Sequence, residues 1–386
     1  MTGTIRSMDL TRRAALGGAA LAVPSLAWAT PDTRVFAQPP WAGYRSSARR
    51  QLEAMRQLSA TDLAVPATEW RADLDLSALA DHPAAIKLLD RAEDDPTRQF
   101  RLTTRTLAAL FAANGLDPVE TRERLDEQMI LFALRGCTLV DPAMTGLPVK
   151  AVTLSVQPVD HVAPRCIIGV WRRDQKRIAV FSGSTVPNRW AMAMQAAAFA
   201  QPGRTVWRMA NVLATGRHDF IVGAHGGWQP SALISAGRDG RAVPQPAFRS
   251  KSGSLTKAEM VLDPVVVLDN IHPALTPADP QGAAFSSEGC LTLAERTPPQ
   301  EWTRSPPDWT AFSELARLRR LSARERKLHG LVLLTGAEAW MAANRQQVER
   351  VRYGSRGPAA EAARRAAGFR NGDLIDLAAY ARLNAS

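Results

Sequence analysis

Short apolar runs separated by turn-forming residues begin near Pro148 and limit the fold of this chain more than any other feature. Cys166–Trp171 and Arg177–Phe181 are apolar and partly β-branched, and the charged turn between them predicts a β-hairpin. The other predicted strands are Lys150–Val156, Asp219–Val222, Met260–Asp269, Gly289–Leu293 after a turn, and Gly330–Thr335. No series of strand–helix units with crossover helices accompanies them, so a doubly wound parallel sheet is disfavoured. The pattern predicts a β-rich α+β protein.

Helical patterns precede this β-rich part. Residues 30–145 predict a helical N-terminal region, in which Thr103–Ala113 is a good helix that ends at an Asn-Gly stop signal. Pro118–Gly136 predicts another helix, because its acidic residues come early and Arg135 comes late, as the helix dipole favours. The sequence therefore predicts a small helical domain with no catalytic constellation of its own.

Further helices are predicted within and after the β-rich part, which we place at 146–348. Arg189–Ala200 and Ala337–Arg345 have helical composition, and the Trp- and Arg-rich segment 296–328 is predicted to be an insertion that becomes helical. Residues 349–386 predict two helices joined by a Gly-rich turn. Helical segments are therefore expected on both sides of the β-rich domain.

The N-terminal residues 1–29 have the layout of a secretory signal. Arg12 and Arg13 precede the mildly apolar run Ala14–Ala27, and Ala27-Trp28-Ala29 is a small-x-small cleavage site. The paired arginines favour the twin-arginine route. The run is shorter than the about 20 residues of a spanning helix, so no stable membrane span is expected. We expect an exported, periplasmic or extracellular protein; a buried amphipathic N-terminal helix is the alternative.

The chain of 386 residues has a formal net charge of +11, which indicates contact with polyanions. A bacterial wall supplies such polyanions, and nucleic acid is the rival partner. The sequence shows no basic motif interleaved with aromatic residues and no zinc-finger spacing. Nucleic acid is therefore not an expected partner.

Cysteine usage separates one thiol from two others. In an oxidising compartment the simplest arrangement is a bridge between Cys137 and Cys166, which leaves Cys290 as a reactive thiol. The alternative is that all three cysteines, Cys290 included, are reduced and buried.

The segment from Asn270 to Leu293 carries the clearest chemical signal. His272 lies upstream of a Ser-Glu-Gly-Cys turn that ends in Cys290. A thiol attacks as the thiolate and needs a nearby base or positive field. Gly289 allows the backbone to bend sharply and to direct N–H groups at a developing oxyanion. Histidine, glycine and cysteine together indicate an acyl-transfer site.

This segment resembles the L,D-transpeptidase family of bacterial cell-wall enzymes. Their signature is a histidine, an intervening segment and a Ser/Thr-His-Gly-Cys turn, and the fourteen residues between His272 and Ser287 match its spacing. Three positions depart from the signature. Glu288 replaces the second histidine, Thr292 occupies a position that is usually Asn or Arg, and Pro273 occupies a position that is usually small.

The resemblance implies a β-rich L,D-transpeptidase-like catalytic domain and assigns roles to its residues. Cys290 would be the nucleophile, His272 the base, and the N–H groups of Gly289 and Cys290 the oxyanion donors. Ser287 would hydrogen-bond within the turn or orient the base. Substrate contacts would come from Glu288, Thr292 and His225, the last of which lies in a Gly-rich loop near the catalytic strands.

The function expected from the resemblance is acyl transfer on peptidoglycan stem peptides, through a thioester, in cell-wall biogenesis. It requires no metal and no organic cofactor. The tail 349–386 resembles a small peptidoglycan-binding module; the alternative is a basic helical hairpin that binds no ligand. One alternative is a cysteine amidase or L,D-carboxypeptidase with the same dyad. Another is a non-catalytic wall-binding protein. A zinc hydrolase using His218, His225, His272 and Asp269 is disfavoured, because none shows a compact ligand spacing such as His-Glu-x-x-His.

Overall fold

A computed structural model of this chain describes residues 91–92, 94–117, 128–159, 161, 163–188, 191, 211–225, 229–237, 239, 241–250, 260–265, 269–274, 287, 289–295, 306–318, 327–346, 350–370 and 372–384. The expected signal segment 1–29, nearly all of the predicted helix Arg189–Ala200, and Glu288 lie outside these residues.

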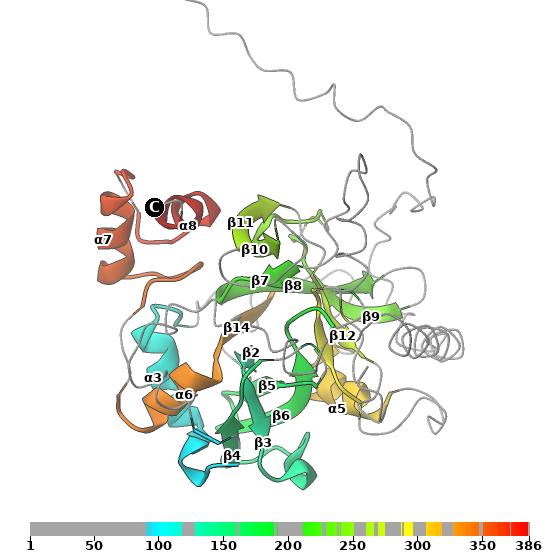
Figure 1. The fold of residues 1–386 in the computed structure, drawn as a ribbon. Coiled ribbons are helices and arrows are strands. Elements are labelled where there is room, and N and C mark those ends of the chain that lie inside the picture. Colours follow the sequence, from blue (N-terminus) through cyan, green and yellow to red (C-terminus); the bar gives the residue numbers. More distant parts are fainter. Residues whose placement is uncertain are drawn as a thin grey trace, which may run out of the picture.

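Strands of the described part close into an eight-stranded barrel with the order β12-β13-β6-β5-β2-β14-β8-β9 (Figure 1). Their bounds are β2 Met129–Arg135, β5 Cys166–Arg172, β6 Arg177–Ser184, β8 Gly216–His225, β9 Gln229–Ile234, β12 Ile271–Pro273, β13 Leu291–Leu293 and β14 His329–Thr335. The predicted hairpin is confirmed, since β5 and β6 pair antiparallel with Arg172 opposite Arg177. Two pairs are parallel, β2 with β14 and β12 with β13.

Two smaller sheets accompany the barrel. One has the order β1-β4-β3, with β1 at Gln99–Thr103, β4 at Ala151–Val156 and β3 at Cys137–Leu139. The other has the order β11-β10-β7, with β11 at Met260–Val265, β10 at Gln245–Ser250 and β7 at Asn211–Leu213. The predicted strand Met260–Asp269 ends three residues before His272 in the sequence. However, β11 and the strand that carries His272 belong to different sheets.

The helices are α3 Thr104–Ala113, α5 Pro307–Leu315, α6 Gly336–Ala343, α7 Pro358–Ala366 and α8 Leu377–Leu383; Pro96–Arg98 and Pro142–Met144 form 3-10 turns. Thr103 begins α3 by accepting the Thr106 N–H at 3.0 Å. Thr335 and Glu338 cap α6 reciprocally. Although α3 and α6 are far apart in the sequence, they lie side by side (Figure 1).

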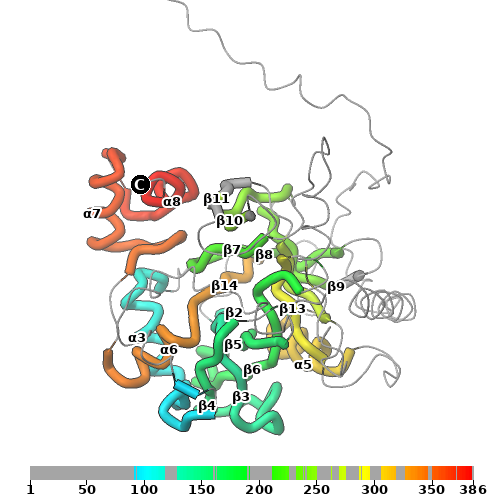
Figure 2. The backbone as a smooth tube through the Cα atoms, in the orientation of Figure 1, coloured from blue at the N-terminus to red at the C-terminus, as the bar shows by residue number. Residues whose placement is uncertain are grey.

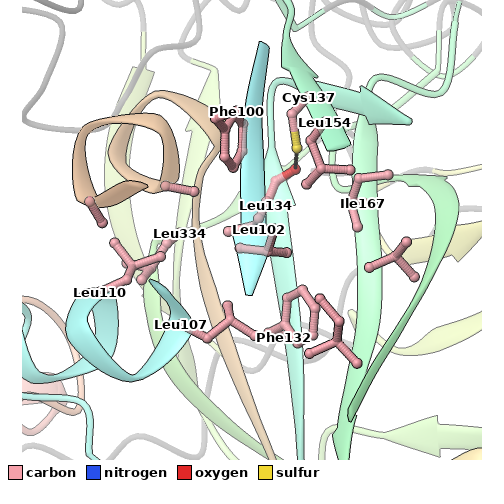
Figure 3. Close-up of a cluster of buried hydrophobic side chains, with 14 of the residues drawn as sticks. Phe100, Leu102, Leu107, Leu110, Phe132, Leu134, Cys137, Leu154, Ile167 and Leu334 are labelled. Carbon is pink, nitrogen blue, oxygen red and sulfur yellow. Dashed lines mark hydrogen bonds between the residues drawn. The ribbon is translucent and has the colours of Figure 1, made fainter. Parts of the chain in front are cut away.

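Strand β2 is buried on both faces and separates two apolar clusters. Met129, Leu131 and Ala133 join the cluster that contains β12, β13 and α5. Phe132 and Leu134 point the other way, toward β1 and α3, as Figure 3 shows. The predicted helix Pro118–Gly136 is therefore wrong over the residues of β2. A run of good helix formers that is buried on both faces lacks the alternation that identifies a strand.

The expected bridge between Cys137 and Cys166 is not formed, and both are free, buried thiols. Cys137 Sγ donates to the Leu134 carbonyl at 3.2 Å, and Cys166 Sγ lies 3.5 Å from the Ile167 carbonyl. Burial raises the pKa of Cys137 well above its ordinary value and that of Cys166 to about 12. Neither thiol ionises near neutral pH, so both serve packing rather than chemistry.

The two predicted helices of the tail are present as α7 and α8, and α8 packs against the sheet of β10 and β11 (Figure 2). Their shared apolar cluster includes Ala214, Ala360, Ile375, Ala379 and Tyr380. Arg352, just before α7, is buried and bonds Asn114, Thr215 and Glu338. The tail is therefore joined to α3 and α6 through one side chain.

No helix in the described part of the chain is both long enough and apolar enough to cross a membrane.

Candidate active site

Two adjacent parallel strands position the residues that the motif singled out: His272 lies in β12, and Cys290 immediately precedes β13. In the register of β12 and β13, Ile271 lies opposite Leu291 and His272 opposite Thr292. Ile271 and Leu291 pack in the apolar cluster of the barrel. Because side chains alternate along a strand, His272 and Thr292 belong to the opposite face, and Cys290 precedes that position by two residues. The alternation of side chains along these strands thus places the base, His272, and the thiol, Cys290, on the same face of the sheet.

A third side chain, that of His225 in β8, reaches this face. Strand β9 lies between β8 and β12, and the pairing of β8 with β9 shifts register between Gly223 and His225. Such a bulge redirects a side chain locally. His225 thereby stacks on His272, with ring centroids 4.6 Å apart and an interplanar angle of 13°. One ring nitrogen of each histidine and Cys290 Sγ all lie within 4.8 Å of one another.

His272 is a neutral imidazole with a defined tautomer. Its Nδ1 lies 2.9 Å from the Pro273 carbonyl oxygen, which can only accept, so Nδ1 carries the proton and Nε2 is the acceptor. Burial lowers the pKa of His272 to about 3, and the neighbouring His225 lowers it further. Protonation of His272 is therefore favourable only beside a compensating negative charge, which a thiolate at Cys290 supplies.

The turn that presents Cys290 depends on Gly289. Its φ is +150°, and a Cβ there would lie 2.6 Å from Asn211 Nδ2 and 2.8 Å from Asp269 Oδ1. Ser287 Oγ accepts the Gly289 N–H at 3.1 Å and donates to the Cys290 carbonyl at 2.8 Å. Of the two roles expected for Ser287, the structure therefore has the one within the turn. The Gly289 N–H, expected to bind an oxyanion, is engaged by this serine.

Several polar residues lie around the thiol, and of these the sequence had singled out only Asp269. The backbone N–H of Asn270 donates to Cys290 Sγ at 3.5 Å. Behind the turn, Asn211 Nδ2 donates to the buried carboxyl group of Asp269. Burial raises the pKa of Asp269 to about 7, although Arg249 partly offsets the rise. A polar residue at the end of an apolar strand, as at 269–270, is the sequence signal that could also have identified Asn270.

The remaining predicted site residues fall in three places. Thr292 is fully buried, and its Oγ1 has no hydrogen-bond partner among the described residues. Glu288 is outside those residues. His218 is buried, with Nε2 2.8 Å from the Ala214 carbonyl. Within the described part, the cluster that could hold a metal ion is His225, His272 and Cys290, a donor set that suits Zn²⁺, and it includes neither His218 nor Asp269.

Comparisons of this chain with protein-family models, with curated proteins and with solved structures find no match. The chemical interpretation therefore depends on the arrangement of these residues.

Proposed function

We propose that this protein is an exported cysteine acyltransferase of the L,D-transpeptidase kind, which acts on peptidoglycan stem peptides. The observation that carries the proposal is the approach of Cys290 Sγ and the histidine nitrogens to within 4.8 Å of one another. A neutral imidazole that accepts at Nε2, beside a thiol at the start of the neighbouring strand, is the arrangement that nucleophilic catalysis by cysteine requires.

The reaction begins with transfer of the Cys290 proton to His272 Nε2. The thiolate then attacks an amide carbonyl carbon, a C–S bond forms, and the carbonyl π electrons move to oxygen. Collapse of this tetrahedral species reforms the carbonyl and breaks the C–N bond, and the leaving amine takes the proton from His272. An acceptor amine next attacks the thioester and restores the thiol, which gives a new amide bond.

Stem peptides are the proposed substrate because of the sequence signature around His272 and Cys290. The expected export segment and the basic charge of +11 suit an enzyme of the cell wall. The tail carrying α7 and α8 is proposed to face the wall polymer, since it resembles a peptidoglycan-binding module. If water replaces the acceptor amine, the same site acts as a carboxypeptidase.

Mass spectrometry of the protein incubated with tetrapeptide muropeptides tests this proposal. We expect a covalent adduct on Cys290 and a cross-linked or trimmed product, both lost in Cys290→Ala. Cys166→Ala is the matched control, because it removes a buried thiol that has no place in the site. Absence of adduct and product from the folded wild-type protein would exclude acyl transfer on these peptides.

A further inference from the structure

The side chain of Asn270 has a fixed orientation between two partners. Its Oδ1 accepts the backbone N–H of Ser235 at 2.9 Å. A backbone N–H can only donate, so the oxygen of the amide must lie on that side. The Nδ2 group is therefore directed at His225 Nδ1, 2.5 Å away. The Asn270 amide is thus a donor to the ring, and its orientation follows from the protein backbone.

This orientation determines the tautomer of His225. An amide NH₂ group can only donate, so His225 Nδ1 is an acceptor and carries no proton. The neutral ring then carries its proton on Nε2. Burial lowers the pKa of His225 to about 4, which keeps the ring neutral near pH 7. His225 and His272 are therefore opposite tautomers: His272 accepts at Nε2, and His225 donates from Nε2.

The candidate site has a place for such a donor, because one of its two expected oxyanion donors is already engaged. The attack of Cys290 places negative charge on the former carbonyl oxygen, and donors normally stabilise that charge from about 2.7–3.1 Å. The N–H of Gly289, one of the two donors expected from the sequence, is bonded to Ser287 Oγ. The N–H of Asn270 is directed at Sγ. A ring nitrogen of His225 lies within 4.8 Å of Sγ, which is close enough for an acyl oxygen to fit between them.

We propose that His225 binds the oxyanion of the acyl-transfer reaction by donating from Nε2, and that Asn270 positions it by fixing its tautomer. This inference rests on the proposed acyl transfer at Cys290, but it does not depend on the identity of the substrate. A neutral imidazole is suited to this task because it donates a hydrogen bond without adding a second cation beside the protonated His272. The bulge in β8 between Gly223 and His225 is the backbone feature that brings the ring to this position.

Two reagents that modify the same thiol separate this role from a merely structural one. A p-nitrophenyl acetate ester acylates Cys290 through a tetrahedral oxyanion, with release of nitrophenolate. Iodoacetamide alkylates the same sulfur by displacing iodide, and no oxyanion forms. Both rates would be measured on the full chain, with the site of modification assigned by mass spectrometry.

His225→Phe keeps a flat ring against His272 but removes the donor. We expect its acylation rate to fall about 10²–10³-fold while its alkylation rate stays unchanged, as for loss of one oxyanion donor. His225→Gln keeps an N–H group near Nε2 and should recover part of the acylation rate. Asn270→Asp replaces the donor to Nδ1 with an acceptor, which moves the proton of His225 to Nδ1, so acylation should again fall selectively.

A parallel loss of both rates in His225→Phe would overturn the inference and leave a packing role. An unchanged acylation rate would overturn it as well. Stoichiometric zinc in the purified protein, lost in His225→Gln, would show that the ring is a metal ligand instead. Failure of the ester to acylate the wild type, despite alkylation by iodoacetamide, would count against acyl transfer itself. Selective loss of acylation without any muropeptide product would leave the inference intact and reject only the substrate.

Discussion

Gly289 is the residue on which the geometry of the candidate nucleophile depends. Its φ of +150° and the close approach of Asn211 and Asp269 leave no room for a side chain. We expect Gly289→Ala to lower the free energy of unfolding by about 1–3 kcal/mol and to slow the labelling of Cys290. Denaturant unfolding and thiol labelling would measure the two effects.

Gly357→Ala is the matched control for that substitution. Gly357 also has a positive φ, +93°, but a Cβ there meets nothing within 4 Å. Its replacement should cost only the backbone strain, about 1–3 kcal/mol, and leave the labelling of Cys290 unchanged. Equal labelling in the two variants would show that Gly289 does not shape the turn around the thiol.

The buried histidines predict a loss of stability in acid. Burial lowers the pKa of His272 and His329 to about 3 and that of His218 and His225 to about 4. Between these pKa values and 6.5 the unfolded chain binds more protons than the folded chain. The contribution of the buried neutral histidines to the free energy of unfolding is therefore complete above pH 6.5 and is lost as the pH falls. Asp269 opposes this, because its raised pKa makes its contribution decrease as the pH rises from 3.8 toward 7.

Replacement of His329 measures how much one buried histidine contributes to the loss of stability in acid. It is buried, and neither ring nitrogen has a hydrogen-bond partner within the described residues. The free energy of unfolding would be measured in urea at pH 7 and at pH 4.5. Between these two pH values it should fall by about 2–3 kcal/mol less in His329→Leu than in the wild type. The same difference in both proteins would mean that His329 is protonated or exposed in the folded state.

The sequence predicts the reacting atoms of the site better than it predicts their supports. His272, Gly289 and Cys290 belong to one short motif, so their spacing alone identifies them. Asn270 contacts Ser235 and His225, which are 35 and 45 residues away in the chain. Contacts of this kind depend on the closure of β8, β9 and β12 into one sheet. No local pattern records that closure, and the tautomer of His225 could not be predicted without it.

Among the elements, β2 shows how tertiary structure overrides local preference. Its sequence, Met-Ile-Leu-Phe-Ala-Leu-Arg, contains mostly good helix formers, and all of its residues are buried. The strands β4, β5 and β6 could be predicted from the sequence, because β4 shows alternation and a charged turn separates β5 from β6. The strand nature of β2 follows from its partners, β5 on one side and the distant β14 on the other.

The pairing of β2 with β5 makes a specific prediction. Phe132 lies opposite Gly169, and a Cβ added at Gly169 would overlap the Phe132 ring. Gly169→Ala should therefore destabilise the fold by about 1–3 kcal/mol through overpacking. In Gly169→Ala combined with Phe132→Leu, the smaller partner should relieve part of this cost. A double-mutant cycle measured by denaturant unfolding checks the coupling, and simple additivity would contradict the pairing.

At the scale of the molecule, segments that the sequence separates into regions share their cores. The predicted N-terminal region supplies β1, which pairs with β4, and β2, which lies inside the barrel. The tail contacts the same structure through the buried Arg352, which bonds Asn114 at the end of α3 and Glu338 in α6. Boundaries at 145 and 348 were predicted because the composition and the local sequence pattern change there. In the structure, contacts between buried residues cross both boundaries.

This sharing predicts that the tail is required for the fold of the rest. A chain ending at residue 348 would expose the apolar cluster around Ala214 and leave the buried Glu338 carboxylate without its cation. We expect it to lack a cooperative thermal transition by circular dichroism and to aggregate on size exclusion. Arg352→Met tests the same connection in the full chain, and it should cost about 3–5 kcal/mol because one partner of a buried ion pair is removed. Unchanged melting of both proteins would instead establish residues 349–386 as a separate module, free to bind the wall polymer independently of the barrel.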